Sequence, residues 1–272
     1  MPRLSRLSLA VATLLTATSA LAQDANKDAR TLDTLIVTGT RVADRTVAES
    51  QSPIDIITPE ALQATGATEL ATALARALPS LNFPRPAIAD GTSGVRPAQL
   101  RGLSPDQVLI LVNGKRRHVS ALVNVNGTIG RGSSAVDLNA IPVVAIERVE
   151  VLRDGASAQY GSDAIAGVVN IVLKGAGTGG SLILGGGQYA EGDGSQWQAS
   201  GDAGLTLGGG AGELHVAAQA GHQDATDRSG TYQGTAPDTG NFPGIGEKAF
   251  KLGDPDVAQL AAAANASLDV TD

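Results

Sequence analysis

Few side chains in this sequence could do covalent or metal chemistry. Cysteine is absent, which excludes disulfides, thiolate metal sites and a cysteine nucleophile. The three histidines, His118, His215 and His222, have no metal-ligand spacing, so we expect no metal site. The G-x-S-x-G motif of serine hydrolases does not occur. The sequence therefore predicts no catalytic residues and no cofactor, and an exported enzyme is the least favoured function.

A glycine motif for dinucleotides is present but lies in the wrong context. Gly175 to Gly180 match G-x-G-x-x-G and follow an apolar run. The motif binds a pyrophosphate only where a helix begins directly after it. The next residues, Ser181 to Leu184, are β-prone, so we reject dinucleotide binding.

Length and charge narrow the class of protein. The chain has 272 residues, enough for one large domain or two small ones. The chain has 20 Lys and Arg against 27 Asp and Glu, which gives a net charge of −7. It contains no basic run that could follow a phosphate backbone. Nucleic-acid binding is therefore disfavoured.

The first 22 residues are typical of a secretory signal. Arg3 and Arg6 precede a short apolar stretch, and Ala20 to Ala22 supply small residues at a cleavage point. The alternative is an amphipathic N-terminal helix. Beyond this segment no apolar run reaches 18 residues, so we expect no membrane-spanning helix in the mature chain.

The composition changes near residue 174. Of the 34 glycines, 12 lie in residues 1–174 and 22 lie in residues 175–272. This change predicts a domain boundary at Lys174–Gly175.

The first part is predicted to mix helices and strands. One short helix should begin at Pro59, with Thr58 as N-cap, and end near Gly66. A second, capped by Thr68, carries leucines at every fourth position and should end before Pro79.

Three β-prone runs accompany these helices. Residues 108–112 precede Asn113–Gly114, a pair that favours a tight hairpin turn. Residues 146–152 and 167–173 are the other two candidate strands.

The second part alternates with a period of two. From Gln196 to Leu207 the odd positions are apolar and the even positions are mainly polar, and Leu214 to Ala220 continue the alternation. Residues 181–189 form a weaker strand. This pattern is typical of strands with one face toward lipid and one toward a lumen, although a solvated antiparallel sheet would also show it. The secretory signal favours the membrane barrel. Residues 223–272 are predicted to be a long loop, with a helix from Asp254 through Ala264.

Five segments in order carry a family resemblance. They are DTLIVTGTR at 33–41, LRGL at 100–103 followed by VLILVNGKRR at 108–117, VDLNAIP at 136–142, IERVEVLRDG at 146–155 and AQYGSDAIAGVVN at 158–170. Together they resemble the start of a TonB-dependent outer-membrane receptor. The resemblance implies an α+β plug domain, a small mixed sheet with short helices, followed by the start of an antiparallel transmembrane β-barrel. The expected organisation is a signal peptide at 1–22, an extension with a TonB box at 23–44, a plug at 45–174 and the first barrel strands at 175–272.

The family's barrel has 22 strands, and the chain is short for it. Strands of ten residues would need about 220 residues before any loops. Only 98 residues follow Lys174. We therefore expect an incomplete barrel and a truncated chain.

The resemblance also implies the partners. The TonB box would be captured by TonB, the energised inner-membrane partner, through strand addition. An edge strand is the alternative for this segment. The box residues are Asp33, Thr34, Leu35, Ile36 and Val37.

A second implied site is a set of charges that hold the plug in the barrel. In the family such charges pair with barrel acids, and the alternative is an exposed edge strand guarded by charge. The matching residues here are Arg101, Glu147, Arg148, Glu150 and Arg153.

Two polar stretches, 83–99 and 118–135, are similar to plug loops that meet substrate. A solvated loop is the alternative for each residue. The substrate would be a small molecule or glycan, such as an iron chelate or cobalamin. The candidates are Arg85, Arg96, His118, Asn124 and Arg131. The main hypothesis is thus a nutrient receptor embedded in outer-membrane lipid, and its rival is a free-standing periplasmic plug-like module that binds ligand.

Overall fold

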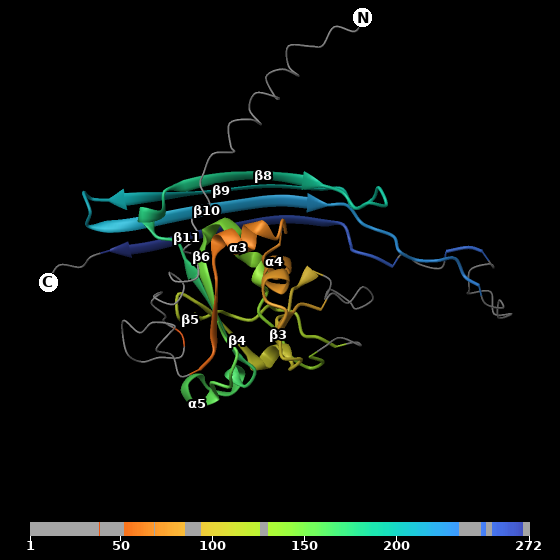
Figure 1. The fold of residues 1–272 in the computed structure, drawn as a ribbon, viewed down its shortest axis with the longest axis horizontal. Helices are drawn as coiled ribbons and strands as arrows, with labels where there is room; N and C mark the ends of the chain where they lie inside the picture. The colour runs from red at the N-terminus through yellow and green to blue at the C-terminus, as the bar shows by residue number, and fades with distance from the viewer. Residues whose placement is uncertain are drawn as a thin grey trace, which may run out of the picture.

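A computed structural model describes residue 38 and residues 52–67, 69–84, 94–125, 130–233, 246–248 and 252–268. Two main sheets organise the chain. A five-stranded sheet lies in the plug region (residues 52–174), and a four-stranded outer sheet (β8 to β11) lies across one side of it (Figure 1).

The plug-region sheet has a mixed strand order that places β6 inside. Its order is β1-β6-β7-β4-β5, with β4 and β7 parallel and the other pairs antiparallel. Because β6 lies between two strands, an exposed edge is the wrong interpretation of its charges. The bounds are Ile54–Ile57 for β1, Val108–Val112 for β4, Lys115–Arg116 for β5, Ile146–Leu152 for β6 and Gly167–Leu173 for β7.

Local signals set the predicted hairpin and the first helix. Asn113 and Gly114 have φ of 49° and 74°, the conformation that the two-residue turn between β4 and β5 requires. Helix α3 (Pro59–Ala64) begins after Thr58, whose side chain accepts a hydrogen bond from the Ala61 amide at 3.3 Å. Both predictions are confirmed.

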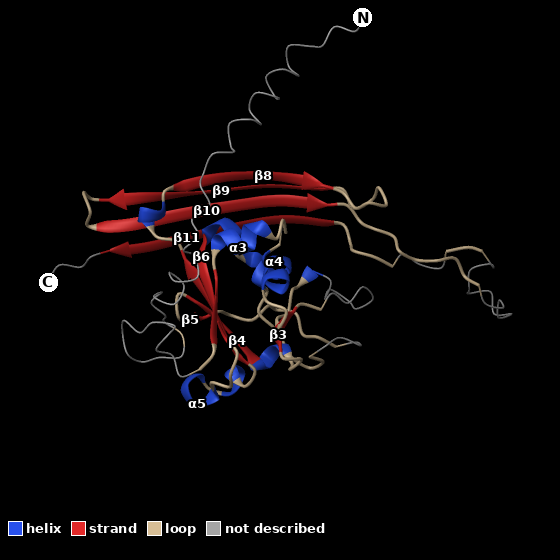
Figure 2. Cartoon of the chain, viewed as in Figure 1, coloured by secondary structure: helices blue, strands red, loops and turns tan. Residues whose placement is uncertain are grey.

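The second helix begins one residue later than the predicted N-cap, Thr68, implied. Helix α4 (Leu70–Ala77) has Glu69, not Thr68, at the N-cap position, and Glu69 makes no side-chain cap bond. Helices α3 and α4 lie between the outer sheet and the rest of the plug region (Figure 2). The shorter elements are β2 (Leu81–Asn82), β3 (Gln99–Leu100), α5 (Ser157–Tyr160) and the 3-10 turns η3 (Pro105–Gln107), η4 (Leu138–Ala140), η5 (Val143–Ala145), η6 (Ser162–Ala164) and η7 (Ala176–Thr178).

Alternating side chains divide the core between the two faces of the plug-region sheet. Val149, Val151 and Ile171 pack with the helices α3 and α4 on one face. On the other face, Leu109 and Leu152 pack in a cluster with Ala164 of η6. Burial of these apolar side chains holds the sheet and helices together at about 25 cal/mol per Å² of apolar surface.

The outer sheet is antiparallel, with the strand order β11-β10-β9-β8. Its strands are β8 (Gly180–Gly187), β9 (Gln196–Leu207), β10 (Gly212–Gln223) and β11 (Val257–Leu268). Among the described residues the sheet is open, with β8 and β11 at its two edges.

The last strand corrects a sequence prediction. Residues 257–268 form β11 and pair with β10 along their whole length, where a helix from Asp254 to Ala264 was expected. Alanine fills both faces of this segment, so the period of two is hidden and the high helix propensity of alanine dominates the local signal. The unpaired edge of β10 overrides that propensity, because pairing satisfies the backbone of both strands.

The two faces of the outer sheet differ in polarity as the alternation predicted. Ser200, Asp202, His215 and Gln219 are buried and face the plug region. Large apolar side chains on the other face are exposed: Leu182, Leu184, Trp197, Leu205, Val216 and Leu260. Among the described residues, no helix combines the length and the hydropathy needed to cross a bilayer.

Candidate functional site

Glu150 is a buried carboxylate on an interior strand of the plug-region sheet. Its side chain is 0% exposed on β6, directly opposite Asn170 of β7. Its Oε2 accepts hydrogen bonds from the Thr38 amide at 3.1 Å, the Thr38 hydroxyl at 2.5 Å and Asn170 Nδ2 at 3.3 Å. Arg148 Nε donates to Oε1 at 3.0 Å and supplies a countercharge. Such partners are what allow a carboxylate to be buried in ionised form.

The residue that follows the segment predicted to meet TonB contacts this carboxylate. Residues 33–37 lie outside the described residues, but Thr38, the next residue, is described and fully buried. The chain directly after the predicted box is therefore held by a strand from the middle of the plug region.

The predicted locking charges make several contacts inside the plug region. Arg148 also pairs with Glu147 at 2.7 Å, and Arg153 pairs with Asp55 at 2.5 Å. Arg101 donates to the backbone oxygens of residues 165 and 166, at 3.5 and 3.0 Å. These contacts do not test the predicted pairing with barrel acids.

A different charge cluster joins the plug region to the outer sheet. Lys174, just after β7, donates to Asp202 Oδ2 of β9 at 3.3 Å, and His215 Nε2 of β10 lies 2.9 Å from the same oxygen. Ser181 of β8 donates to the other oxygen of Asp202. Asp202 and His215 are almost fully buried. Sequence reasoning missed this cluster, although Asp202 and His215 fall at inward positions of the predicted alternation.

Uncharged groups extend the same junction. Asn113 of the hairpin turn donates to Asn265 of β11 at 3.1 Å, and Asn265 donates to the Lys174 carbonyl at 3.1 Å. Gln219 accepts from the Val143 amide at 3.2 Å. Gln259 donates to the Asn139 carbonyl at 2.6 Å. Gln219, Gln259 and Asn265 thus each meet a plug-region backbone group or a plug-region side-chain amide.

A glycine allows the closest approach between the two parts. A Cβ at Gly204 of β9 would lie 2.3 Å from the carbonyl oxygen of Ala176 in η7. No side chain fits at that distance, so Gly204 sets how closely η7 packs on β9.

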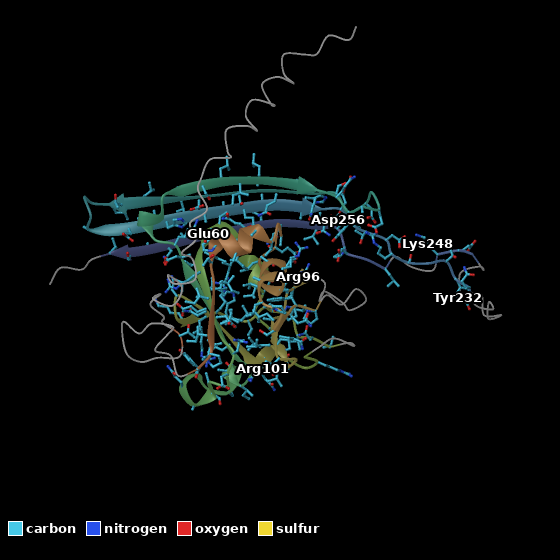
Figure 3. The ribbon with its side chains drawn as sticks, viewed as in Figure 1. Glu60, Arg96, Arg101, Tyr232, Lys248 and Asp256 are labelled. Carbon is cyan, nitrogen blue, oxygen red and sulfur yellow. The ribbon has the colours of Figure 1, made fainter. Side chains whose placement is uncertain are left out.

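The predicted substrate-contacting residues are in unlike environments. Arg96 is 3% exposed and pairs with Glu69 at 3.1 Å. Figure 3 shows Arg96 within the plug region. Asn124 is also buried, whereas His118 and Arg131 are exposed. Arg85 lies outside the described residues.

A cluster of charges joins the loops at one end of the outer sheet. Arg228 donates to both oxygens of Asp193, at 2.9 Å for Nη2, and lies 5.4 Å from the centre of the Tyr189 ring. The Arg228 hydrogen bonds hold the pKa of Asp193 below its ordinary value, and Asp193 raises the pKa of Arg228. Hydrogen bonds from Lys248, at 2.8 Å, and Ser229 lower the pKa of Asp227.

One nearby trio could hold a metal ion. His222, Asp224 and Asp256 each offer one ligand atom, and these atoms lie within 4.8 Å of one another. The spacing of the histidines gave no sign of this trio, because Asp256 is distant in sequence and lies directly before β11. Exposed carboxylates often gather in this way without a metal, so the trio defines no function.

Comparison with known proteins agrees with this arrangement. The TonB-dependent Receptor Plug Domain family matches residues 46–168. The vitamin B12 transporter BtuB of Vibrio vulnificus is 34% identical over 168 residues, 62% of this chain and 24% of that protein. The ferric enterobactin receptor of Pseudomonas aeruginosa is 35% identical over 140 residues, 51% of this chain and 18% of that protein. The chain thus spans a quarter or less of the length of these two relatives.

Solved structures show the same fold. A variant of the Pseudomonas aeruginosa ferric enterobactin receptor superimposes with a TM-score of 0.58 and 25% identity, over 81% of this chain and 31% of that one. The siderophore receptor PirA of Acinetobacter baumannii superimposes with a TM-score of 0.50 and 26% sequence identity, over 66% of this chain and 26% of that one. The matching plug domain, its junction to antiparallel strands and these partial relatives together indicate a TonB-dependent receptor.

Proposed function

We propose that this chain is the gating part of an outer-membrane receptor that takes up a scarce nutrient with energy delivered by TonB. The observation that carries the proposal is the seating of the plug region on the polar face of the outer sheet. The opposite face exposes Leu182, Leu184 and Leu260, and an apolar face of this kind suits contact with lipid.

The energy would enter at the N-terminal extension. TonB would add a strand to residues Asp33, Thr34, Leu35, Ile36 and Val37, and a row of main-chain hydrogen bonds resists a pull along the strand. Force on this segment would reach the plug at Thr38, where Glu150 holds it. The gate would then open by rearrangement of the plug region.

The substrate would be a small molecule or a glycan that the receptor meets from outside the cell. The relatives named above are a vitamin B12 transporter and a ferric enterobactin receptor. His118 and Arg131 remain the exposed candidates for contact with it. Arg96 and Asn124 are buried, so they would act by positioning the loops and not by direct contact with the substrate.

Replacement of Ile36 by proline tests the TonB interaction. Proline removes a main-chain donor from the added strand, so Ile36→Pro should abolish crosslinking to TonB in a receptor that carries this sequence. Ile36→Val keeps the donor and is the matched control. Unchanged crosslinking of Ile36→Pro would refute the box assignment. Recovery of the protein as a soluble periplasmic monomer would instead favour a free-standing ligand-binding module.

A further inference from the structure

A cavity lies between the plug region and the first strands of the outer sheet. Its volume is about 350 Å³, and it is bounded by α3 and η5 on one side and by β8 and β9 on the other. Val144 and Ile183 form part of its apolar wall. None of the residues assigned above to TonB, to locking charges or to substrate lines it.

The polar part of the lining carries no charge. It consists of the side chains of Gln63 from α3 and Gln196, Gln198 and Ser200 from β9. Amides and hydroxyls both donate and accept hydrogen bonds. An ionised ligand would lose its water here without gaining a countercharge, so the lining suits an uncharged group that is rich in hydrogen-bonding atoms.

Ser200 indicates what the cavity can bind. Its side chain is 3% exposed, and its Oγ has no hydrogen-bond partner among the described residues. A buried hydroxyl without a partner is unfavourable, so such groups are normally satisfied by water or by a ligand. Because Ser200 lines the cavity, a bound hydroxyl, amide or water could satisfy this Oγ.

The polar stripe of the cavity ends at the buried charge cluster. Along the inward face of β9, Gln196, Gln198 and Ser200 span about 13 Å from the loop end of the strand. The next inward residue is Asp202, which Lys174 and His215 hold in the cluster. The stripe therefore begins near the loops and stops at the junction between plug region and outer sheet.

We propose that this cavity is a transit site for an uncharged solute that carries hydroxyl or amide groups. The inference rests on the proposed function, because it gives the solute a place beside the plug before the gate opens. It also adds a chemical class, since the lining selects against charge.

Cysteine labelling tests the site without knowledge of the substrate. The chain contains no cysteine, so Ser200→Cys introduces a single thiol at the cavity. The probes are the neutral hydroxyethyl methanethiosulfonate and the negatively charged sulfonatoethyl methanethiosulfonate, added to outer-membrane preparations of a receptor that carries this sequence. We expect the neutral probe to label the thiol of Ser200→Cys at least tenfold faster than the charged probe.

Two further variants make the result decisive. Ala261→Cys is the matched control, because Ala261 is 6% exposed, faces inward from β11 and does not line the cavity. Gln198→Cys probes a second lining position if Ser200→Cys folds poorly, and it should show the same preference for the neutral probe. The proposal would be overturned if both lining variants were labelled no faster than the control variant. It would also be overturned if the neutral and the charged probe labelled the lining variants at equal rates. Loss of TonB crosslinking in the Ile36→Pro experiment is a separate readout, so the two proposals can fail independently.

Discussion

The carboxylate of Glu150 accepts two hydrogen bonds from Thr38, one from its amide and one from its hydroxyl. Both residues are fully buried, although they are 112 positions apart in the chain. Thr38 cannot leave this position without depriving a buried charge of two donors. The contact is therefore a restraint on the chain directly behind the predicted TonB box.

Replacement of Glu150 by glutamine should loosen this restraint. Glutamine keeps an oxygen acceptor but removes the charge, and a hydrogen bond to a charged group is stronger than a neutral one by about 1 kcal/mol or more. We expect the Thr38 amide to exchange with deuterium about tenfold faster or more in Glu150→Gln. Hydrogen-exchange mass spectrometry of a peptide that contains Thr38 measures the rate.

Glu147→Gln is the control for this measurement. Glu147 shares the Arg148 partner with Glu150 but is exposed, and its contact with Arg148 lies at the surface. The exchange rate at Thr38 should stay within about twofold of the unchanged protein. Equal exchange in both variants would mean that Glu150 does not restrain Thr38.

The Gly204 contact predicts a difference between two glycines of the same face. Gly204→Ala places a Cβ against the Ala176 carbonyl and should lower the free energy of unfolding by about 1–3 kcal/mol, as overpacking does. Gly185→Ala on β8 meets no atom within 4 Å and should be neutral or stabilise by up to about 1 kcal/mol. Thermal unfolding in detergent compares them. A similar loss in both variants would assign the effect to the strands rather than to the packing of η7.

Strands with strong local signals were predictable from the sequence. Residues 108–112, 146–152, 167–173 and 196–207 form strands with the predicted bounds, because β-branched runs or strict alternation define them. The strand at 257–268 was not predictable, since alanine occupies both faces and gives no alternation. Its pairing with β10 is a tertiary effect that no local pattern contains.

The junction contacts were hidden for a related reason. Lys174 and Asp202 are 28 residues apart, and Asn113 and Asn265 are 152 apart. The period of two shows that Asp202 faces inward, but the register of three strands decides which plug-region group it meets. Thr38 and Glu150 meet only after the chain has passed through most of the plug region. Inward positions could be named from the sequence, whereas the partners depend on the assembled fold.

The loop cluster predicts a dependence on pH. Arg228 lowers the pKa of Asp193, so the ion pair stabilises the loops at pH values above the ordinary Asp pKa of 3.8 and is lost as the pH falls through the lowered pKa. A nitroxide on Ser195→Cys, an exposed position between Asp193 and β9, reports the loop. Its mobility should stay low from pH 7 to about pH 4 and rise at lower pH.

Arg228→Gln is the comparison for this titration. Without the guanidinium the pKa of Asp193 returns toward 3.8, and the nitroxide should already be mobile at pH 7. Equal mobility with and without Arg228 at neutral pH would show that the ion pair does not order these loops.

The single tryptophan offers a direct test of contact with lipid. Trp197 is the chain's only tryptophan and is 52% exposed on the apolar face of the outer sheet. If this face meets acyl chains, Trp197 should emit at short wavelength in a reconstituted receptor, and brominated lipids should quench it. A solvated sheet would leave the indole in water, with emission at long wavelength and no quenching. Lys115→Trp in a Trp197→Phe background provides the control, because Lys115 is exposed on the plug-region hairpin and should escape the lipid quencher. Quenching at position 115 equal to that at 197 would show that the quencher does not report the outer face.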